Sequence, residues 1–295
     1  MKGMREIRNR IKAVKSTGQI THAMELVAAS KMKKAQMYAE QGRAYATLLM
    51  DLTKSVGSEI YRVVARNLEL GQSKKRLVIV FSTDKGLCGG LNTNLFKAIS
   101  EIKGDVDFIT VGIRAARFIA RTKRKVLANF RISDHVKFSE TRKIADFAMK
   151  TAKEGGYASI EVLYSIFINT LKQEPTLVKI APVDDMDWFI ESLKKSYKLD
   201  VADHPKEDRR FVFEPSLTEI AQNLPSFYIN QAIHYMALDA KASEHSARMV
   251  AMKSASDNAD SLIQDLTLEY NKARQSAITT EILELSAAAN TENSQ

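Results

Sequence analysis

Apolar residues recur three and four positions apart along both ends of the chain, while the middle follows a different pattern. Near the N-terminus one such row gives way to a neighbouring one: Met4, Ile7, Ile11 and Val14, then Ile20, Met24, Val27, Ala28, Met32, Ala35 and Ala39. Toward the C-terminus a single row continues without a break: Tyr235, Leu238, Ala242, His245, Met249, Met252, Ser256, Ala259, Ile263, Leu266, Tyr270, Ala273 and Ala277. Such spacing puts these residues on one face of a helix and is typical of the seam of a coiled coil.

These rows predict two long helices. The first is expected from about Lys2 to near Ser55, with a break at Gly57, and the last from about Pro215 to about Leu285. At roughly 1.5 Å per residue the last helix is on the order of 100 Å long, longer than a compact domain of this size can contain. It therefore projects from the globular part, and its natural partner is the first helix.

The low glycine and proline content agrees with long helices, since the chain has only 12 Gly and 5 Pro. Gly18 is the exception, because it lies inside the first helix, where Gly costs up to about 1 kcal/mol relative to Ala. We expect it to be tolerated because a neighbouring surface approaches closely at that point.

The middle of the chain alternates short apolar strands with helices. Strands are expected at 77–81, 108–111, 160–169 and 176–182, and helices at 94–102, 114–121 and 141–153. This alternation predicts a βαβ unit with a largely parallel sheet. The polar stretch 200–210 is expected to be a loop.

The fold class is therefore α/β, a long antiparallel coiled coil of the N- and C-terminal helices plus a βαβ Rossmann-like globular domain. The middle domain joins the end of the first helix to the start of the last, so both helices leave it on the same side. The last helix is the longer, and its end is expected to extend beyond its partner. The predicted parts are an N-terminal shaft helix at 1–66, an α/β globular foot at 74–210, a C-terminal shaft helix at 211–290 and a disordered tail at 291–295.

Charge narrows the choice of partners. The net charge is +9, and residues 1–43 hold ten Lys or Arg against three Glu, a balance of +7. A basic helix favours nucleic acid, anionic lipid or an acidic protein surface as partner, although the solvated face of a coiled coil explains the same pattern. Nucleic acid is the weaker choice, because the first helix has no aromatic residue before Tyr38.

Membrane insertion and secretion find no support in the sequence. The longest strongly apolar run, Leu77 to Phe81, is far too short to span a bilayer, and the N-terminus lacks the apolar core of a signal peptide. Cys88 is the only cysteine, which excludes an internal disulfide and fits a reducing compartment.

One turn resembles a binding site, the glycine-rich stretch between the strand at 77–81 and the helix that follows it. Its foot motif comprises Asp84, Gly86, Cys88, Gly89, Gly90 and Asn92. A glycine-rich strand-to-helix turn can hold a phosphate, but this spacing is neither G-x-G-x-x-G nor a Walker A loop. Tight turns and close packing explain it better.

No set of side chains assembles into a catalytic or metal site. Cys88 has no histidine partner in the sequence pattern, and His245 lies on the helical seam, where a packed polar residue is expected. The histidines have no metal-ligand spacing: His22, His135, His204, His234 and His245. Carboxylates of the last helix are expected on solvated faces: Glu244, Asp257, Asp260, Asp265, Glu269, Glu281 and Glu284. We expect no enzyme activity and no cofactor.

Four further segments stand out, in order along the chain: ITHAMELVAASKMKKAQ at 20–36, DKGLCGGLNTNLF at 84–96, SEHSARMVAMKSASDN at 243–258 and YNKARQSAITTEIL at 270–283. Together they resemble the gamma subunit family of F-type ATP synthases. The resemblance covers both long helices and the foot. The motifs resemble those of bacterial members, and the cysteine-bearing insertion of chloroplast members is absent.

The resemblance implies a non-catalytic central rotor. In that family the coiled coil stands inside a hexamer of alpha and beta subunits, and the foot sits on the membrane-embedded c-ring beside the epsilon subunit. Ion-driven rotation of the ring then changes the catalytic sites on the beta subunits in turn. It implies a peripheral protein on the cytoplasmic face of the bacterial cell membrane, with no membrane span of its own and no nucleic-acid partner.

The resemblance also assigns residues for coupling and partner contact. In the first helix they are Met24, Lys31, Lys33 and Lys34, facing acidic loops of beta; in the last helix they are Arg248, Gln275, Thr279, Glu281 and Glu284. The chain departs from the family at Gly18 and His22, where a longer polar residue and a lysine are common, and at 286–289, where many members have a glycine pair.

Two other classes stay open on the residues alone. One is a nucleotide-binding enzyme built on the α/β foot, which saturable binding of ATP or a dinucleotide would reveal. The other is a coiled-coil adaptor or nucleic-acid-binding rod, which salt-sensitive binding of DNA or RNA through the basic first helix would reveal.

Overall fold

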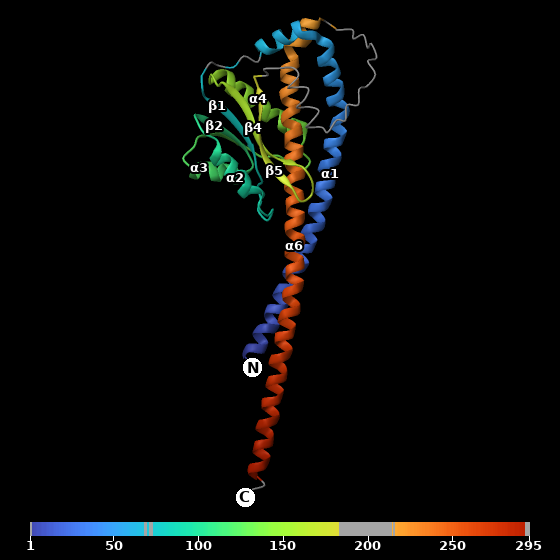
Figure 1. Ribbon diagram of the computed structural model, residues 1–295, viewed down its shortest axis with the longest axis vertical. Coiled ribbons are helices and arrows are strands. Elements are labelled where there is room, and N and C mark those ends of the chain that lie inside the picture. The colour runs from blue at the N-terminus through green and yellow to red at the C-terminus, as the bar shows by residue number, and fades with distance from the viewer. Residues whose placement is uncertain (1, 68–69, 71–72, 183–213, 215, 293–295) are drawn as a thin grey trace. The chain divides into compact units, whose positions relative to one another are not determined.

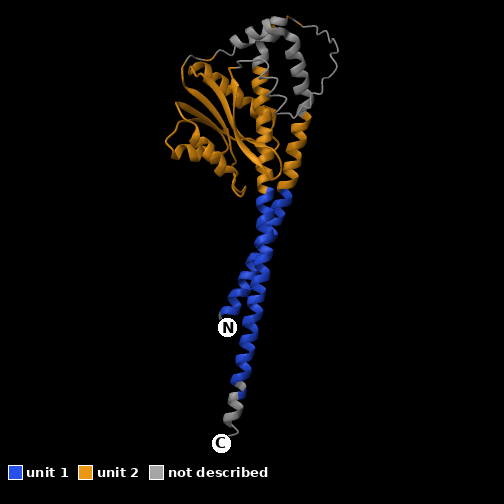
Figure 2. Ribbon diagram, viewed as in Figure 1, with its two compact units in different colours: residues 1–27, 249–295 blue, residues 28–248 orange. Residues whose placement is uncertain are grey.

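The computed structural model describes residues 2–67, 70, 73–182, 214 and 216–292. They form two compact units, which are considered separately (Figure 2). Unit 1 contains residues 1–27 and 249–295, and unit 2 contains residues 28–248. The predicted loop at 200–210, and with it the predicted boundary between foot and C-terminal shaft, lies outside the described residues.

Unit 2 is built on a five-stranded sheet in the order β3-β2-β1-β4-β5. Strands β3, β2, β1 and β4 run parallel, and β5 pairs antiparallel with β4 (Figure 1). The strands are β1 Arg76–Phe81, β2 Val106–Val111, β3 Val126–Phe130, β4 Ser159–Phe167 and β5 Gln173–Ala181. The helices are α1 Lys2–Asn67, α2 Leu91–Glu101, α3 Ile113–Arg121, α4 Phe138–Glu154 and α6 Leu217–Glu292.

Alternate residues of β1 bury against two different layers of helix. Leu77 and Ile79 pack with α4 and with residues 228–238 of α6, while Val78 and Val80 pack with α2 and α3. From β1 the chain adds β2 and β3 on one side, and it then crosses back to add β4 on the other side of β1. Because each parallel crossover is right-handed, α2 and α3 lie on one face of the sheet and α4 lies on the other. Unit 2 is therefore a helix–sheet–helix sandwich, the predicted Rossmann-like arrangement.

The sequence predicts most elements of unit 2 but omits β3. The segment 126–130 has no regular alternation, and it forms an edge strand in which no residue is fully buried. The break expected at Gly57 is wrong, because α1 continues through it to Asn67. The expected parallel sheet is confirmed for β1 to β4, and the antiparallel β5 was not foreseen.

In unit 1 the first residues of α1 lie beside α6 in antiparallel orientation, which confirms the predicted coiled coil (Figures 1 and 2). On α6, Met252, Ala259 and Leu266 of the predicted seam are buried. The second α1 row is partly wrong, because Ile20 is 58% exposed and Val27 is 55% exposed. The buried row instead continues from Val14 through Gly18 and Thr21 toward Ala28.

Gly18 explains this difference. A Cβ added to Gly18 would lie 3.3 Å from the Cβ of Ala259, so the two helices approach closely at a point where neither carries a large side chain. Sequence reading favours Ile20 because it expects an apolar side chain on every turn. The close approach expected at Gly18 is confirmed.

The pairing also fixes how far α6 continues alone. Counting sixteen residues back from Gly18 reaches Lys2, where the described part of α1 begins, and counting sixteen on from Ala259 reaches Gln275. Beyond Gln275, α6 runs past the described part of α1 and exposes Ile278 and Ile282.

Replacing Gly18 with Leu is expected to destabilise the helix pair, because the added side chain overlaps Ala259. We expect a loss of about 1–3 kcal/mol in the free energy of unfolding, measured by urea unfolding and by faster amide hydrogen exchange in the first turns of α1. Gln19→Leu adds the same side chain at an exposed position of the same helix and is the control. Equal effects of the two variants would contradict the close approach at Gly18.

Candidate functional site

The carboxyl edge of the sheet is where an α/β domain of this topology normally binds a ligand. The strand order reverses between β1 and β4, and the crevice outside the carboxyl ends of such strands is the usual binding position. The glycine-rich turn 82–90 follows β1 at this edge and leads into α2. The sequence motif and the topological switch point therefore coincide.

Helix α6 of the same chain fills this crevice. The Ser243 hydroxyl donates to the carbonyl of Ser165 in β4 at 2.8 Å, and the Phe167 N–H donates to a carboxylate oxygen of Asp239 at 3.1 Å. On the other side, the Arg248 guanidinium donates to the carbonyl of Gly86 at 3.4 Å. Residues 239–248 thus bridge the end of β4 and the turn after β1.

The turn after β1 is held by its own side chains. The Thr83 hydroxyl donates to the carbonyl of Lys85 at 2.7 Å and accepts from the amide of Asn92 at 2.8 Å. A carboxylate oxygen of Asp84 accepts from the N–H of Ile113 at 3.0 Å, which caps the first turn of α3. Asp84 and Asn92 of the foot motif are therefore structural.

Gly112, at the start of α3, must be glycine for the turn to form. Its φ is 101°, and a Cβ there would lie 2.3 Å from the carbonyl oxygen of Ser82. The Ser82 hydroxyl in turn accepts from the N–H of Ala115 at 3.0 Å. The turn after β1 and the start of α3 are consequently one packed structure.

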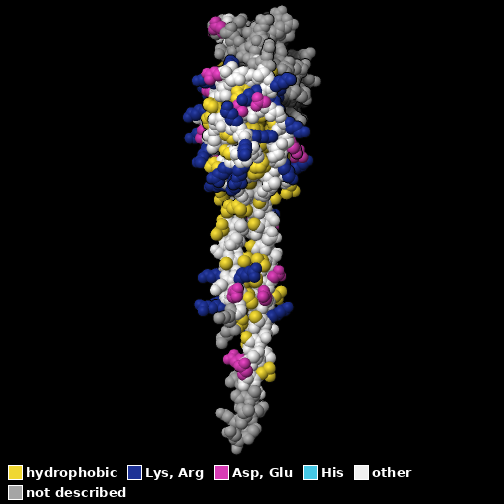
Figure 3. Space-filling model, turned by 90° about the vertical axis from the view of Figure 1, so that its left-hand side faces the viewer, with side chains coloured by type: hydrophobic (Ala, Val, Ile, Leu, Met, Phe, Trp, Pro, Cys, Tyr) yellow, Lys and Arg dark blue, Asp and Glu magenta, His cyan; other side chains and the backbone are white. Residues whose placement is uncertain are grey.

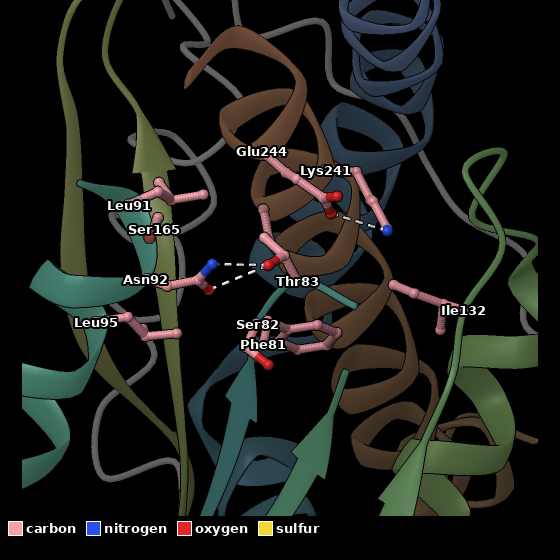
Figure 4. A pocket seen from close by; sticks show the side chains of 11 residues that line it. Phe81, Ser82, Thr83, Leu91, Asn92, Leu95, Ile132, Ser165, Lys241 and Glu244 are labelled. Atoms are coloured by element: carbon pink, nitrogen blue, oxygen red, sulfur yellow. Dashed lines mark hydrogen bonds and ion pairs between the residues drawn. The ribbon is translucent and has the colours of Figure 1, made fainter. Parts of the chain in front are cut away.

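What remains of the crevice is a cavity of about 20 Å³, room for about one water molecule. Thr83 and Asn92 face each other on one side of it, and Lys241 and Glu244 of α6 lie on another (Figure 4). This cavity is far too small for a nucleotide. This cavity argues against the alternative of a nucleotide-binding enzyme, because the position at which such a fold holds its nucleotide is filled by α6.

A chain of buried charges lies along α6 beside this cavity. Glu244 is 6% exposed and lies between two cations, with Lys241 Nζ 2.9 Å from one carboxylate oxygen and an Arg248 nitrogen 2.9 Å from the other. Burial raises the pKa of Glu244, but the charges of Lys241 and Arg248 lower it by more than burial raises it. The pKa of Glu244 therefore lies below its usual range. Glu244 is thus ionised, and its predicted place on a solvated face is wrong.

Asp134, in the segment between β3 and α4, contacts two helices of unit 2, α1 and α6. Its carboxylate lies 2.6 Å from Lys31 Nζ of α1 and 3.7 Å from Lys241 Nζ of α6. It also lies 3.5 Å from His245 Nε2 of α6. Burial raises the pKa of Asp134, but the hydrogen bond from Lys31 and the charge of Lys241 outweigh it, so the pKa lies below its ordinary value.

His245 is a packed histidine, as its place on the seam predicts. It is 2% exposed, and neither ring nitrogen has a hydrogen-bond partner among the residues described. Burial lowers the pKa of His245 to about 4, against the raising effect of Glu244 and Asp134. The ring is therefore neutral at pH 7.

Cys88 is also structural. It is 2% exposed, and its sulfur accepts a hydrogen bond from the Asn92 amide at 3.2 Å. Burial raises the pKa of Cys88 despite the opposing charge of Arg248. A thiol that stays protonated is a poor nucleophile, in agreement with the sequence expectation.

Comparison with known proteins decides the family. The family model described as ATP synthase matches residues 3–291. The ATP synthase gamma chain of Opitutus terrae is 46% identical over 288 residues, which make up 98% of this chain and 98% of that one. That of Methylacidiphilum infernorum is 42% identical over 292 residues, 96% of this chain and 97% of that one. The chain belongs to the ATP synthase gamma chain family.

Solved structures of ATP synthases share its fold. A chain of the Euglena gracilis mitochondrial ATP synthase rotor matches with a TM-score of 0.63 at 18% identity, covering 94% of this chain and 99% of that one. A chain of the Tetrahymena thermophila mitochondrial central stalk and c-ring structure matches with a TM-score of 0.58 at 23% identity, covering 80% and 99%. Both agree with the α/β fold class and its long helices.

The residues that the family resemblance predicts for coupling fall into two groups, those that form no ion pair among the described residues and those that are held by one. Met24 is half-buried on α1, and Lys33 and Lys34 are exposed, whereas Lys31 is held by Asp134 and Arg248 by Glu244. The distal positions of α6 are exposed, and Thr279 donates only to the carbonyl of Gln275 within α6, at 2.9 Å. These distal positions are Gln275, Thr279, Glu281 and Glu284.

Sequence reasoning missed Asp134 and Lys241. A signal for Lys241 existed: it stands three residues before Glu244 and next to the seam residue Ala242, where a helix would bury it. Asp134 gave no signal, because its partners are brought together only by the fold. No group of three or more His, Cys, Asp or Glu residues is placed to hold a metal among those the structure describes.

Stability is expected to fall with acid because of His245. The unfolded chain takes up a proton near the ordinary value of 6.5, while the folded chain takes it up only near 4. The free energy of unfolding therefore decreases as the pH falls through this window, by about 1–2 kcal/mol between pH 7 and pH 5. His245→Gln removes this part of the pH dependence, measured by urea unfolding at both pH values.

The exposed His22, whose side chain is 61% exposed, supplies the control as His22→Gln. The ionised carboxylates of Glu244 and Asp134 also stabilise the fold, but that stability is lost only below their ordinary pKa values of 4.5 and 3.8. It therefore contributes little to the difference between pH 7 and pH 5, in either variant. An unchanged pH 7 to pH 5 difference in His245→Gln would show that another group titrates there.

Proposed function

We propose that this chain is the central rotor shaft of an F-type ATP synthase, which couples ion-driven rotation of a membrane c-ring to ATP synthesis or hydrolysis on an alpha-beta hexamer. The observation that carries this proposal is the 46% identity to an ATP synthase gamma chain over 98% of both chains. The proposal retains the predicted division into a foot at 74–210 and shaft helices at 1–66 and 211–290.

The structure supports a subunit that transmits force and performs no chemistry of its own. Helix α6 fills the crevice in which related folds bind ligands, and Cys88 and the buried carboxylates serve packing and ion pairing. The catalytic sites belong, in this proposal, to the beta subunits.

The proposed partners are the alpha and beta subunits, the epsilon subunit and the c-ring, at the cytoplasmic face of a bacterial membrane. No described helix is long and apolar enough to cross a membrane. For contact with the hexamer we propose the exposed residues of α1 and distal α6, while Lys31 and Arg248 would have to exchange an internal partner for an external one. Such contacts suit a moving interface, because charge interactions at a surface are long-ranged and easily replaced.

The first test is reconstitution of the chain with alpha and beta subunits from one of its relatives. We expect one stable complex containing a single copy of this chain, with a large gain in multi-site ATP hydrolysis over alpha and beta alone. A chain that stays separate while hydrolysis is unchanged would overturn the rotor role and favour the adaptor or nucleic-acid-binding rod.

A second prediction concerns the end of α6 that runs past the described part of α1. Ile278 is 45% exposed and Ile282 is 59% exposed, four residues apart on one face. If the hexamer encloses this face, Ile278→Asp with Ile282→Asp buries two charges and weakens assembly or hydrolysis by about tenfold. Thermal unfolding of the isolated chain is expected to change little.

The matched control is Ser276→Asp with Thr280→Asp, which introduces the same charges at the same spacing on exposed positions of the same helix. If the two double variants reduce assembly equally, the added charge alone causes the loss of assembly. The apolar face of Ile278 and Ile282 would then have no role in the contact.

A further inference from the structure

Helix α3 carries a row of three arginines that the rotor role does not explain. The arginine row consists of Arg114, Arg117 and Arg121, all exposed and spaced three and four residues apart on one face of α3. Ala115 and Ile119, on the opposite face, are fully buried in the sheet domain. The row therefore points away from the core of unit 2.

The row forms no ion pair within the part of the chain that the structure describes. Helix α3 itself contains no acidic residue. Neighbouring exposed cations add to the positive charge, and Figure 3 shows Lys and Arg side chains gathered on the side where α2 and α3 lie. Lys85 and Lys97 stand next to Gly86 and Phe96, which both contact α3, and Lys123 follows the row by two residues.

Helix α4 of the same unit shows what a neutralised surface looks like in this chain. There Arg142 pairs with Asp146 at 3.6 Å, and Lys150 pairs with Glu154 at 3.9 Å. On α3 three- and four-residue spacings bring like charges together, which destabilises a helix. A bound polyanion would relieve this repulsion.

One end of the row is built into the folded turn after β1. The Arg114 guanidinium lies so close to Gly86 that a Cβ there would be 2.9 Å from one of its nitrogens. The backbone N–H of Arg114 donates to the carbonyl of Thr83 at 3.2 Å. The row is thus presented on a fixed helix, so little order has to be gained on binding.

We propose that the arginine row docks an acidic helical segment of another protein. Its outer members are seven residues apart, which is roughly 10 Å along a helix. Glutamates at the same three- and four-residue spacing on a second helix repeat at this pitch. The planar fork of arginine fits a carboxylate with two parallel hydrogen bonds.

The chemistry favours this occupant over the other polyanions. A membrane-binding helix inserts its apolar face, but here that face is buried against the sheet. Single-stranded nucleic acid stacks on exposed aromatic rings, and the rings next to the row, Phe96 and Phe118, stack on each other at 4.4 Å. Carboxylates on a helix need neither insertion nor stacking.

The test uses the full chain and a helix-stapled peptide with glutamates three, four and seven residues apart on one face. Binding is measured by fluorescence anisotropy at low and at high salt. We expect salt-sensitive binding, weakened about tenfold by Arg117→Glu with Arg121→Glu. Arg142→Glu with Lys143→Glu makes the same charge change on α4 and is expected to leave binding nearly unchanged.

A peptide of the same composition with its glutamates distributed around the helix is the ligand control, and it is expected to bind at least several-fold more weakly. Equal binding of the two peptides, or equal loss in the α3 and α4 variants, would overturn the proposal in favour of general polyanion attraction. Row-dependent binding of vesicles containing anionic lipid, without peptide binding, would overturn it in favour of a membrane.

Thermal unfolding of each variant checks that the fold is intact. If Arg117→Glu with Arg121→Glu unfolds, Arg117→Gln with Arg121→Gln removes the charges without reversing them and is expected to give a smaller loss of peptide binding. No loss in a folded Gln variant would overturn the proposal. Neither result depends on assembly with alpha and beta subunits, so this test can fail while the proposed rotor function holds.

Discussion

The contact between α6 and the carboxyl edge of the sheet is the constraint on which the rest of unit 2 depends. Groups at the end of β4 that would face solvent or a ligand in an open α/β domain are bonded here by α6, through Ser243 and Asp239. The same stretch of α6 reaches the turn after β1 through Arg248. One helix therefore fills the crevice and links the end of β4 to the turn after β1. An edge of the sheet that binds a ligand in other α/β domains binds part of a long helix here.

Seating a helix in a crevice brings its charges out of water, and the structure compensates each of them. Glu244 lies between Lys241 and Arg248, while Asp134, in the segment between β3 and α4, approaches Lys241 and His245. A buried ion pair adds little net stability, but removing one partner leaves a buried charge that is costly. Sliding α6 by one turn would break these pairs together, so we expect them to fix its register more than they strengthen its packing.

The sequence predicts the parts of this molecule that have a local cause. The long helices follow from spacing, the central strands from short apolar runs, and Gly18 from the oddity of a glycine inside a helix. The edge strand β3 has no such pattern, since it is only half-buried. The second α1 row was misread because a seam can pass through Gly18 and Thr21 when the partner offers Ala259. Helical spacing alone does not reveal what the opposite helix presents.

Glu244 and Asp134 show more clearly what the sequence alone does not predict. A carboxylate on a long helix is usually solvated, and only the crevice beside β4 makes Glu244 an exception. The ion pairs of Glu244 and Asp134 can be compared with the arginine row on α3. Buried Lys241 has counter-charges both from its own helix, at Glu244, and from another segment, at Asp134, and on α4 Arg142 pairs with Asp146 of the same helix. The three arginines on α3 differ from both, because they stand three and four residues apart on one exposed face and form no ion pair among the described residues. In the proposed complex the acidic helix of the partner supplies their counter-charge.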